Sequence, residues 1–121
     1  MQLAHLMQGS DWPNLGDTLI EGGQATISMT IGEDVRWFQG HFPEQAVLPG
    51  VVQVHWAAKL AKVVFSELTV FSSVKNLKFK TVILPHMNVD LVLNYNQDKK
   101  FVSFSYKQDD QVYSAGILVF V

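Results

Sequence analysis

The alternation of apolar and polar residues predicts strands near both ends of the chain. Residues Ala25 to Ile31 alternate with a period of two, and Gly22-Gly23 just before them suits a tight hairpin, so residues 17–31 are predicted to form a strand pair. Later segments rich in β-branched and aromatic residues are separated by short polar or proline turns. They are expected to form an antiparallel meander, with strands at 75–80, 88–95, 101–107 and 112–121.

A single long helix is predicted between these two groups of strands, over residues 51–67, which contain no Gly or Pro. On a helical wheel four residues form one narrow polar stripe, and nearly all other positions are apolar: His55, Lys59, Lys62 and Ser66. Such a helix must be covered on most sides. The pattern therefore predicts an α+β fold in which a curved antiparallel sheet wraps around one long central helix, as a single domain spanning residues 1–121.

The first twelve residues have no clear period, so we expect a loosely held leader, residues 1–12, that docks through Leu3, Leu6 and Trp12. With 48% hydrophobic and 17% charged residues, the chain has enough apolar material for one packed core. The N-terminus resembles neither a signal peptide nor an anchor, and no apolar run is long enough to span a bilayer. We expect a cytoplasmic protein.

Charge and cysteine content exclude several classes of function. The formal net charge of −2 argues against a nucleic-acid-binding protein. The absence of cysteine excludes disulfides, thiolate metal sites and thiol nucleophiles. The four histidines lack the close spacing of a ligand set, so no metal site is expected. His5 and His86 are interpreted as surface residues.

The segment 37–50 is the unusual part of the chain, because Gly and Pro residues are too frequent in it for a regular element. At its end, Pro49-Gly50 directly precedes the predicted helix. The first N–H groups of a helix have no internal partner and carry the positive end of its dipole, so they can receive a carbonyl oxygen, and Gly50 leaves room for one. Taken alone, Pro-Gly before a helix is usually only a turn.

His41 adds chemistry to this loop, since Gly40-His41-Phe42-Pro43 places an imidazole close in sequence to the helix start. A histidine with a pKa near neutrality can exchange a proton at pH 7. The alternative is a loop histidine whose ring is hydrogen-bonded by backbone groups.

The run from Trp37 to Val51 (WFQGHFPEQAVLPGV) resembles the signature of the 3-hydroxyacyl-acyl-carrier-protein dehydratases of fatty-acid synthesis. The resemblance extends over roughly residues 25–121. It includes a basic-aromatic strand, Leu77-Lys78-Phe79-Lys80, and the proline turn after it, with Val82, Leu84 and Pro85. It implies a hotdog fold, in agreement with the predicted order of elements, and binding of an acyl thioester.

The resemblance also implies roles for single residues. His41 matches the catalytic histidine, and the backbone N–H of Gly50 or Val51 matches the groups that polarise the thioester carbonyl. Fourteen residues after the histidine the family has Glu or Asp, whereas this chain has His55. A smaller branch, the dehydratases of aryl-polyene biosynthesis, resembles the chain from Pro49 to Ala57, histidine included. Lys59 stands where the general family tends to have Gln.

These matches imply dehydration of a 3-hydroxyacyl thioester to the trans-2-enoyl thioester, in a fatty-acid-like or aryl-polyene pathway. His41 is expected to act as base, and His55 to deliver or relay a proton to the leaving oxygen. In the family the two site groups come from different subunits, so the two imidazoles are expected to meet across a dimer interface, with coupled titrations. The alternative is that His55 faces water together with Lys59 and Lys62.

The implied substrate is carried on the 4'-phosphopantetheine of an acyl carrier protein, and no cofactor is expected. Carrier proteins are typically acidic, so Lys75, Lys78 and Lys80 are candidate contacts, unless they are simply a solvated strand face. A homodimer or a dimer-based oligomer is expected, with a heteromer containing a homologous subunit as a further option.

Two other functions remain open from the sequence. One is a hotdog thioesterase, which normally needs a carboxylate to activate water, and Glu44 is the candidate near the site. The other is a non-catalytic partner subunit of a dehydratase complex, because the acid is missing at position 55.

Overall fold

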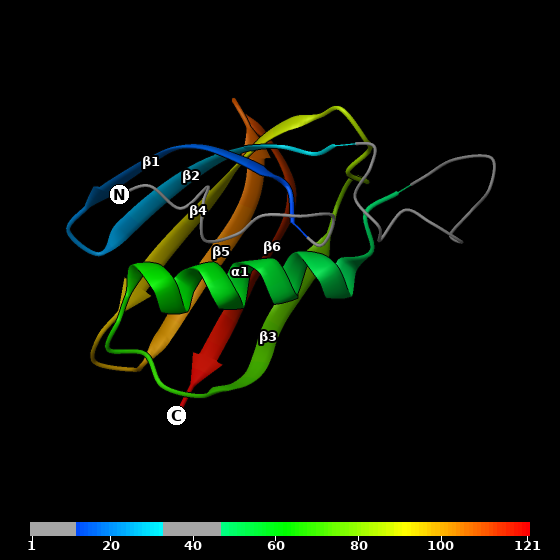
Figure 1. Ribbon diagram of the computed structural model, residues 1–121. Coiled ribbons are helices and arrows are strands. Elements are labelled where there is room, and N and C mark those ends of the chain that lie inside the picture. The colour runs from blue at the N-terminus through cyan, green and yellow to red at the C-terminus, as the bar shows by residue number, and fades with distance from the viewer. Residues whose placement is uncertain (1–11, 33–46) are drawn as a thin grey trace.

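The computed structural model describes residues 12–32 and 47–121, which form one curved antiparallel sheet and one helix (Figure 1). The sheet has six strands in the order β1-β2-β4-β5-β6-β3. The helix α1, Gly50–Val64, lies against one face of this sheet. The strands are β1 (Asn14–Glu21), β2 (Gln24–Thr30), β3 (Phe71–Phe79), β4 (Asn88–Asn96), β5 (Phe101–Gln108) and β6 (Gln111–Phe120).

The predicted fold class and order of elements are confirmed, but several boundaries are wrong, including the start of the strand pair, which is Asn14 and not residue 17. Two other differences have a clear cause. The helix ends at Val64 and not at 67, because Phe65 leaves the helical conformation (φ −107°, ψ 85°) and packs its ring 5.1 Å from that of Tyr95. Strand β3 begins at Phe71, four residues before the predicted start, since Phe71 pairs with Phe120 of β6. In both cases tertiary contacts override the local pattern.

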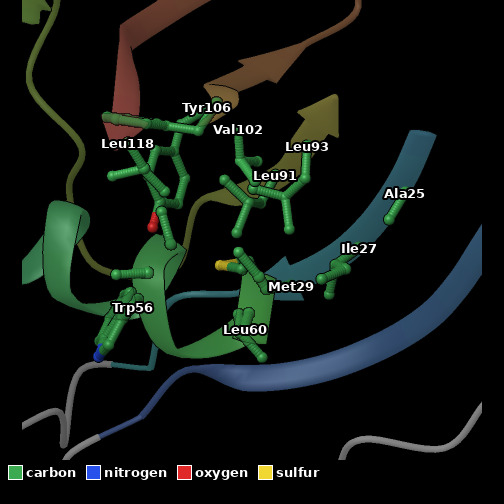
Figure 2. Packing of buried hydrophobic residues seen from close by; sticks show 14 of the residues in the cluster. Ala25, Ile27, Met29, Trp56, Leu60, Leu91, Leu93, Val102, Tyr106 and Leu118 are labelled. Carbon is green, nitrogen blue, oxygen red and sulfur yellow. The ribbon is translucent and has the colours of Figure 1, made fainter. Parts of the chain in front are cut away.

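The core lies between α1 and the inner face of the sheet (Figure 2). Alternate residues of β2, β4 and β5 are buried there, as the period of two requires. The helix contributes Trp56, Ala57, Leu60 and Ala61, all fully buried. Trp12 packs against this core, with its ring 6.3 Å from that of Trp56. The predicted docking through Trp12 is thus confirmed, whereas Leu3 and Leu6 lie outside the described residues.

One row of paired residues crosses five strands of the sheet and ends beneath the first turn of α1. The strand registers place its members side by side on the inner face. In order from β2 to β3 they are Ile27, Leu91, Tyr106, Ser114 and Phe79. This row, called the inner row below, links the register of the sheet to the position of the helix start.

No helix among the described residues has the length and hydropathy that crossing a bilayer requires. The helix α1 has fifteen residues and carries the exposed charges of Lys59 and Lys62.

A bulge in β3 decides which of its side chains face α1. Asn76 has a φ of 54°, and the pairing with β6 changes register between Lys75 and Lys78. The extra residue places both lysines on the outer face although they are three positions apart. It also turns Leu77 and Phe79 toward the inner face, where Leu77 approaches Gly116.

Replacing Asn76 by Val is expected to lower the free energy of unfolding by about 1–3 kcal/mol, because a β-branched residue is strained at positive φ. Urea denaturation followed by circular dichroism measures the change. Asn76→Gly is the matched control, since it also removes the asparagine amide group, but glycine adopts this φ without strain. Equal losses in the two variants would contradict the assignment of strain to residue 76.

Candidate functional site

The start of α1 presents backbone N–H groups that have no acceptor within the described residues. The N-cap residue Pro49 (φ −62°, ψ 144°) makes no side-chain cap, and its carbonyl accepts N–H bonds from Val52 at 3.1 Å and Gln53 at 3.2 Å. The N–H groups of Gly50 and Val51 therefore remain available. The first turn contains no acidic residue, so no carboxylate of α1 neutralises the positive end of its dipole there.

Phe79 lies directly over Gly50 at this helix start. A Cβ atom placed on Gly50 would come within 2.9 Å of both Cε atoms of the Phe79 ring, so only glycine fits beneath the ring as it stands. The ring is 50% exposed. It forms one wall of a pocket of about 350 Å³, which is lined by Val47, Leu48, Pro49, Gly50, Gln53, Phe79, Lys80, Thr81 and Val82. The pocket gives a ligand carbonyl room beside Gly50.

His55 borders a second depression, a groove of about 410 Å³ along the exposed side of α1. Its lining is largely apolar apart from His55 and the two helix lysines, and consists of Val51, Val54, His55, Ala58, Lys59, Lys62 and Phe71. Val51 and His55, one turn apart, share this groove. The imidazole is exposed and packs beside Trp12, with ring centroids 5.9 Å apart. Three members of the predicted polar stripe, His55, Lys59 and Lys62, face outward on α1 in the single chain, whereas Ser66 follows the helix end at Val64.

A buried polar cluster supports the first turn of α1 from below. The side-chain oxygen of Gln53 accepts a hydrogen bond from Ser114 Oγ at 2.7 Å, and its Nε2 donates to the carbonyl of Leu48 at 3.2 Å. The hydroxyl of Tyr106 donates to the backbone oxygen of Gln53 at 2.6 Å. Figure 2 shows Tyr106 reaching from β5 toward α1. Burial raises the pKa of the Tyr106 phenol far above its usual value, so the phenol stays a neutral donor.

The three candidate carrier-contact lysines are all exposed, but they do not form one cluster. Lys75 and Lys78 lie on the outer face of β3, where they pair with Ile117 and Ala115. Lys80 follows the end of the strand and borders the pocket beside Gly50. Lys80 is thus the lysine of the three nearest the helix start.

Several predicted site residues cannot be placed. His41, Glu44 and His5 lie outside the described residues. His86 is exposed in the turn before β4, as predicted. Within residues 12–32 and 47–121, no three His, Asp or Glu side chains gather in a way that could hold a metal ion.

A larger depression, of about 720 Å³, lies at the other end of α1. It is bordered by the β1–β2 turn, Phe65, Glu67 and the β4–β5 turn, and by none of the predicted site residues. Its walls are mainly polar and open, and it does not lie at the start of a helix, so the chemistry favours the helix start over this larger space.

The wheel predicts the exposed stripe but does not identify Gln53 as a site residue. The signal was present, because Gln53 is a polar residue on the otherwise apolar, sheet-facing side of the helix. Ser114 is likewise a polar residue at an inward position of a strand. The contact of Phe79 with Gly50 has no comparable signal, since it depends on the bulge at Asn76.

The single helix packed on a curved six-stranded antiparallel sheet defines a protein of the hotdog class. The sequence matches the ApeI-like family, described as ApeI dehydratase, over residues 18–117. The chain therefore belongs to the ApeI-like dehydratase family, as the resemblance of its loop and helix start implied.

Solved structures agree with this assignment. The dehydratase heterocomplex ApeI:P from Xenorhabdus doucetiae superposes with a TM-score of 0.84 at 29% identity, over 90% of this chain and 97% of that one. An uncharacterized protein from Erwinia carotovora subsp. atroseptica gives a TM-score of 0.73 at 30% identity, over 88% and 91% of the two chains.

Among curated relatives, two 3-hydroxyacyl-[acyl-carrier-protein] dehydratases named FabZ are similar. The one from Novosphingobium aromaticivorans is 30% identical over 70% of this chain, and the one from Erythrobacter litoralis is 31% identical over 64%. The chain covers 58% and 56% of the length of these relatives, respectively.

Replacing Gly50 by Ala is expected to lower the free energy of unfolding by about 1–3 kcal/mol, because the new methyl group displaces the Phe79 ring. In a Phe79→Ala background the same change is expected to be neutral or stabilising by up to about 1 kcal/mol, since Ala favours a helix over Gly. A double-mutant cycle by urea denaturation measures the coupling. An equal cost in both backgrounds would show that the ring does not limit this position.

Proposed function

We propose that this chain dehydrates 3-hydroxyacyl thioesters carried by an acyl carrier protein, in a fatty-acid-like or aryl-polyene pathway. The observation that carries the proposal is the start of α1, where Gly50 lines a pocket and the N–H groups of Gly50 and Val51 have no acceptor within the described residues. A thioester carbonyl bound there would gain negative charge during the reaction, and preorganised donors stabilise such charge. Membership of the ApeI-like dehydratase family supports the same reaction.

The reaction needs one base, one acid and one site for the developing charge. In the proposed mechanism His41 removes the proton from the carbon next to the carbonyl, and the enolate-like charge forms on the oxygen held by Gly50 and Val51. His55, in its protonated form, gives a proton to the hydroxyl on the next carbon. That group leaves as water, and the electron pair forms the double bond of the trans-2-enoyl product.

A dimeric assembly is proposed because His55 opens on a groove at the outer side of α1, where a second subunit can approach. Strand β3 lies at an edge of the described sheet and has nine residues, most of them exposed. An open edge of this length favours pairing with another strand. A second copy, or a homologous subunit, along β3 would cover this edge and part of the groove.

A second candidate function is that of a non-catalytic subunit in such a complex. Two observations favour it: His55 stands where the general family has a carboxylate, and one of the similar solved structures is a heterocomplex of dehydratase subunits. In that case the pocket at Gly50 would bind or present the acyl chain while a homologous subunit supplied the acid.

The purified protein is expected to convert carrier-bound 3-hydroxyacyl substrate to a product lighter by one water, followed by mass spectrometry. Loss of the whole acyl chain would instead indicate a thioesterase. Binding without turnover would contradict the dehydratase function and favour the partner-subunit function.

His41→Ala and His55→Ala are each expected to lower kcat by about 100-fold or more, the usual contribution of an acid or base. His86→Ala, at an exposed histidine that lines neither the pocket nor the groove, is the matched control and should leave turnover unchanged.

Changing Lys78 and Lys80 together to Glu is expected to raise KM for carrier-bound substrate about tenfold, because an acidic carrier would lose two attractions and gain two repulsions. KM for the same acyl group on free pantetheine should rise much less, because of these two lysines only Lys80 borders the pocket. The matched control is the double variant Lys99→Glu, Lys100→Glu. These two exposed lysines lie in the β4–β5 turn, just before the start of β5. Equal increases in KM for the two double variants would show a general charge effect rather than a docking site.

A further inference from the structure

Gln53 occupies a position where an apolar side chain would pack more simply. It is only 3% exposed and lies on the side of α1 that faces the sheet, whereas nearby buried positions of the helix hold Trp56, Ala57 and Leu60. Among the described residues, Gln53 and Ser114 are the two buried residues with polar side chains that lie within the hydrophobic core. Buried amides of this kind need partners, and Gln53 has one for its oxygen and one for its nitrogen.

The partners of Gln53 connect two parts of the molecule. Its Nε2 reaches back five residues to the carbonyl of Leu48, in the segment before the helix. The N–H of Leu48 in turn donates to the carbonyl of Ile83 at 2.8 Å. The peptide groups on both sides of Leu48 are thus fixed by hydrogen bonds. The ring of Pro49, the residue after Leu48, restricts its own φ. The direction in which the Gly50 and Val51 N–H groups point depends on this segment.

The other side of the cluster is anchored in the sheet. Ser114 and Tyr106 are neighbours in the inner row, both fully buried, and each donates one hydrogen bond to Gln53. Phe79, the next member of the row, contacts Gly50 itself. Three adjacent strands therefore hold the first turn of α1 at three points.

We infer that Gln53, supported by Ser114 and Tyr106, is a positioning residue for the thioester carbonyl. It holds the Leu48-Pro49 segment so that the N–H groups of Gly50 and Val51 can point toward one carbonyl oxygen bound at the helix start. This inference rests on the proposed function, because it assigns the same helix start to the carbonyl. Gln53 acts through the backbone and takes no proton from the substrate.

The test measures how strongly the protein polarises a bound carbonyl. The probe is butyryl-pantetheine, isotope-labelled at the carbonyl carbon, which has no hydroxyl group to lose. Difference infrared spectroscopy of the full chain with this probe reports the carbonyl stretching frequency, which falls when hydrogen bonds to the oxygen strengthen. The unsubstituted protein is expected to lower the frequency on binding.

Gln53→Met and Ser114→Ala are expected to lose most of this frequency shift and to lower kcat with hydroxyacyl substrate between about 10-fold and 100-fold, with little change in KM. Tyr106→Phe should show a smaller effect in the same direction. Ser28→Ala is the matched control, since it removes the 3.0 Å bond from Ser28 Oγ to Asp90 Oδ1 between β2 and β4. It should leave the spectrum and kcat unchanged, whatever its effect on stability.

The outcomes separate this inference from the proposed function. If the unsubstituted protein shows neither a frequency shift nor turnover, both are overturned. If the unsubstituted protein shows both and Ser114→Ala keeps the same frequency shift and the same kcat, the positioning role alone is overturned. Should Gln53→Met fail to fold, Ser114→Ala and Tyr106→Phe still decide, because each removes one hydroxyl group and retains the rest of the side chain.

Discussion

The burial of one side of α1 against the inner face of the sheet is the interaction on which the rest of the structure depends. The described residues contain no other helix, so the sheet is the only regular element that covers the apolar side of α1. Residues such as Trp56 and Leu60 are fully buried as a result. Because most of the helix is held by nonspecific apolar packing, a few directional contacts must fix its rotation and its starting point. The inner row provides them at the first turn.

Much of the fold could be predicted from the sequence, because both of its periodic signals are strong. The period of two over Ala25 to Ile31 and the absence of Gly and Pro from residues 51–67 identify the strand pair and the helix without further information. The errors occur where tertiary contacts decide. Phe65 continues the helical pattern in sequence but leaves it to pack on Tyr95. The first four residues of β3 contain two serines and become a strand only because β6 pairs with them.

Of the candidate site, the sequence predicts the available N–H groups but not the residues that support them. Pro49-Gly50 before a helix indicates available N–H groups from chain order alone, and the structure has them. The supports of these groups come from strands more than fifty residues away, such as Ser114 at β6, so no local pattern links them to Gly50. The position of Phe79 depends on a residue at positive φ in the middle of β3, which period-two alternation cannot reveal. The roles of His41 and His55 stay predictions, since His41 lies outside the described residues and His55 faces outward in the single chain.

The inner row also limits how the chain can vary in length. Tyr106 and Ser114 are joined by the hairpin between β5 and β6, and their pairing fixes how many residues that hairpin contains. The pairing already shifts register once, between Tyr106 and Lys107, and insertion of a further residue without a compensating bulge would move Ser114 to the outer face and bring Tyr113 or Ala115 beneath Gln53. Surface turns usually tolerate insertions, but here the turn determines the register of the sheet under the helix start. Families of such proteins should therefore vary in loop length elsewhere, and this short hairpin should be among the least variable segments in length.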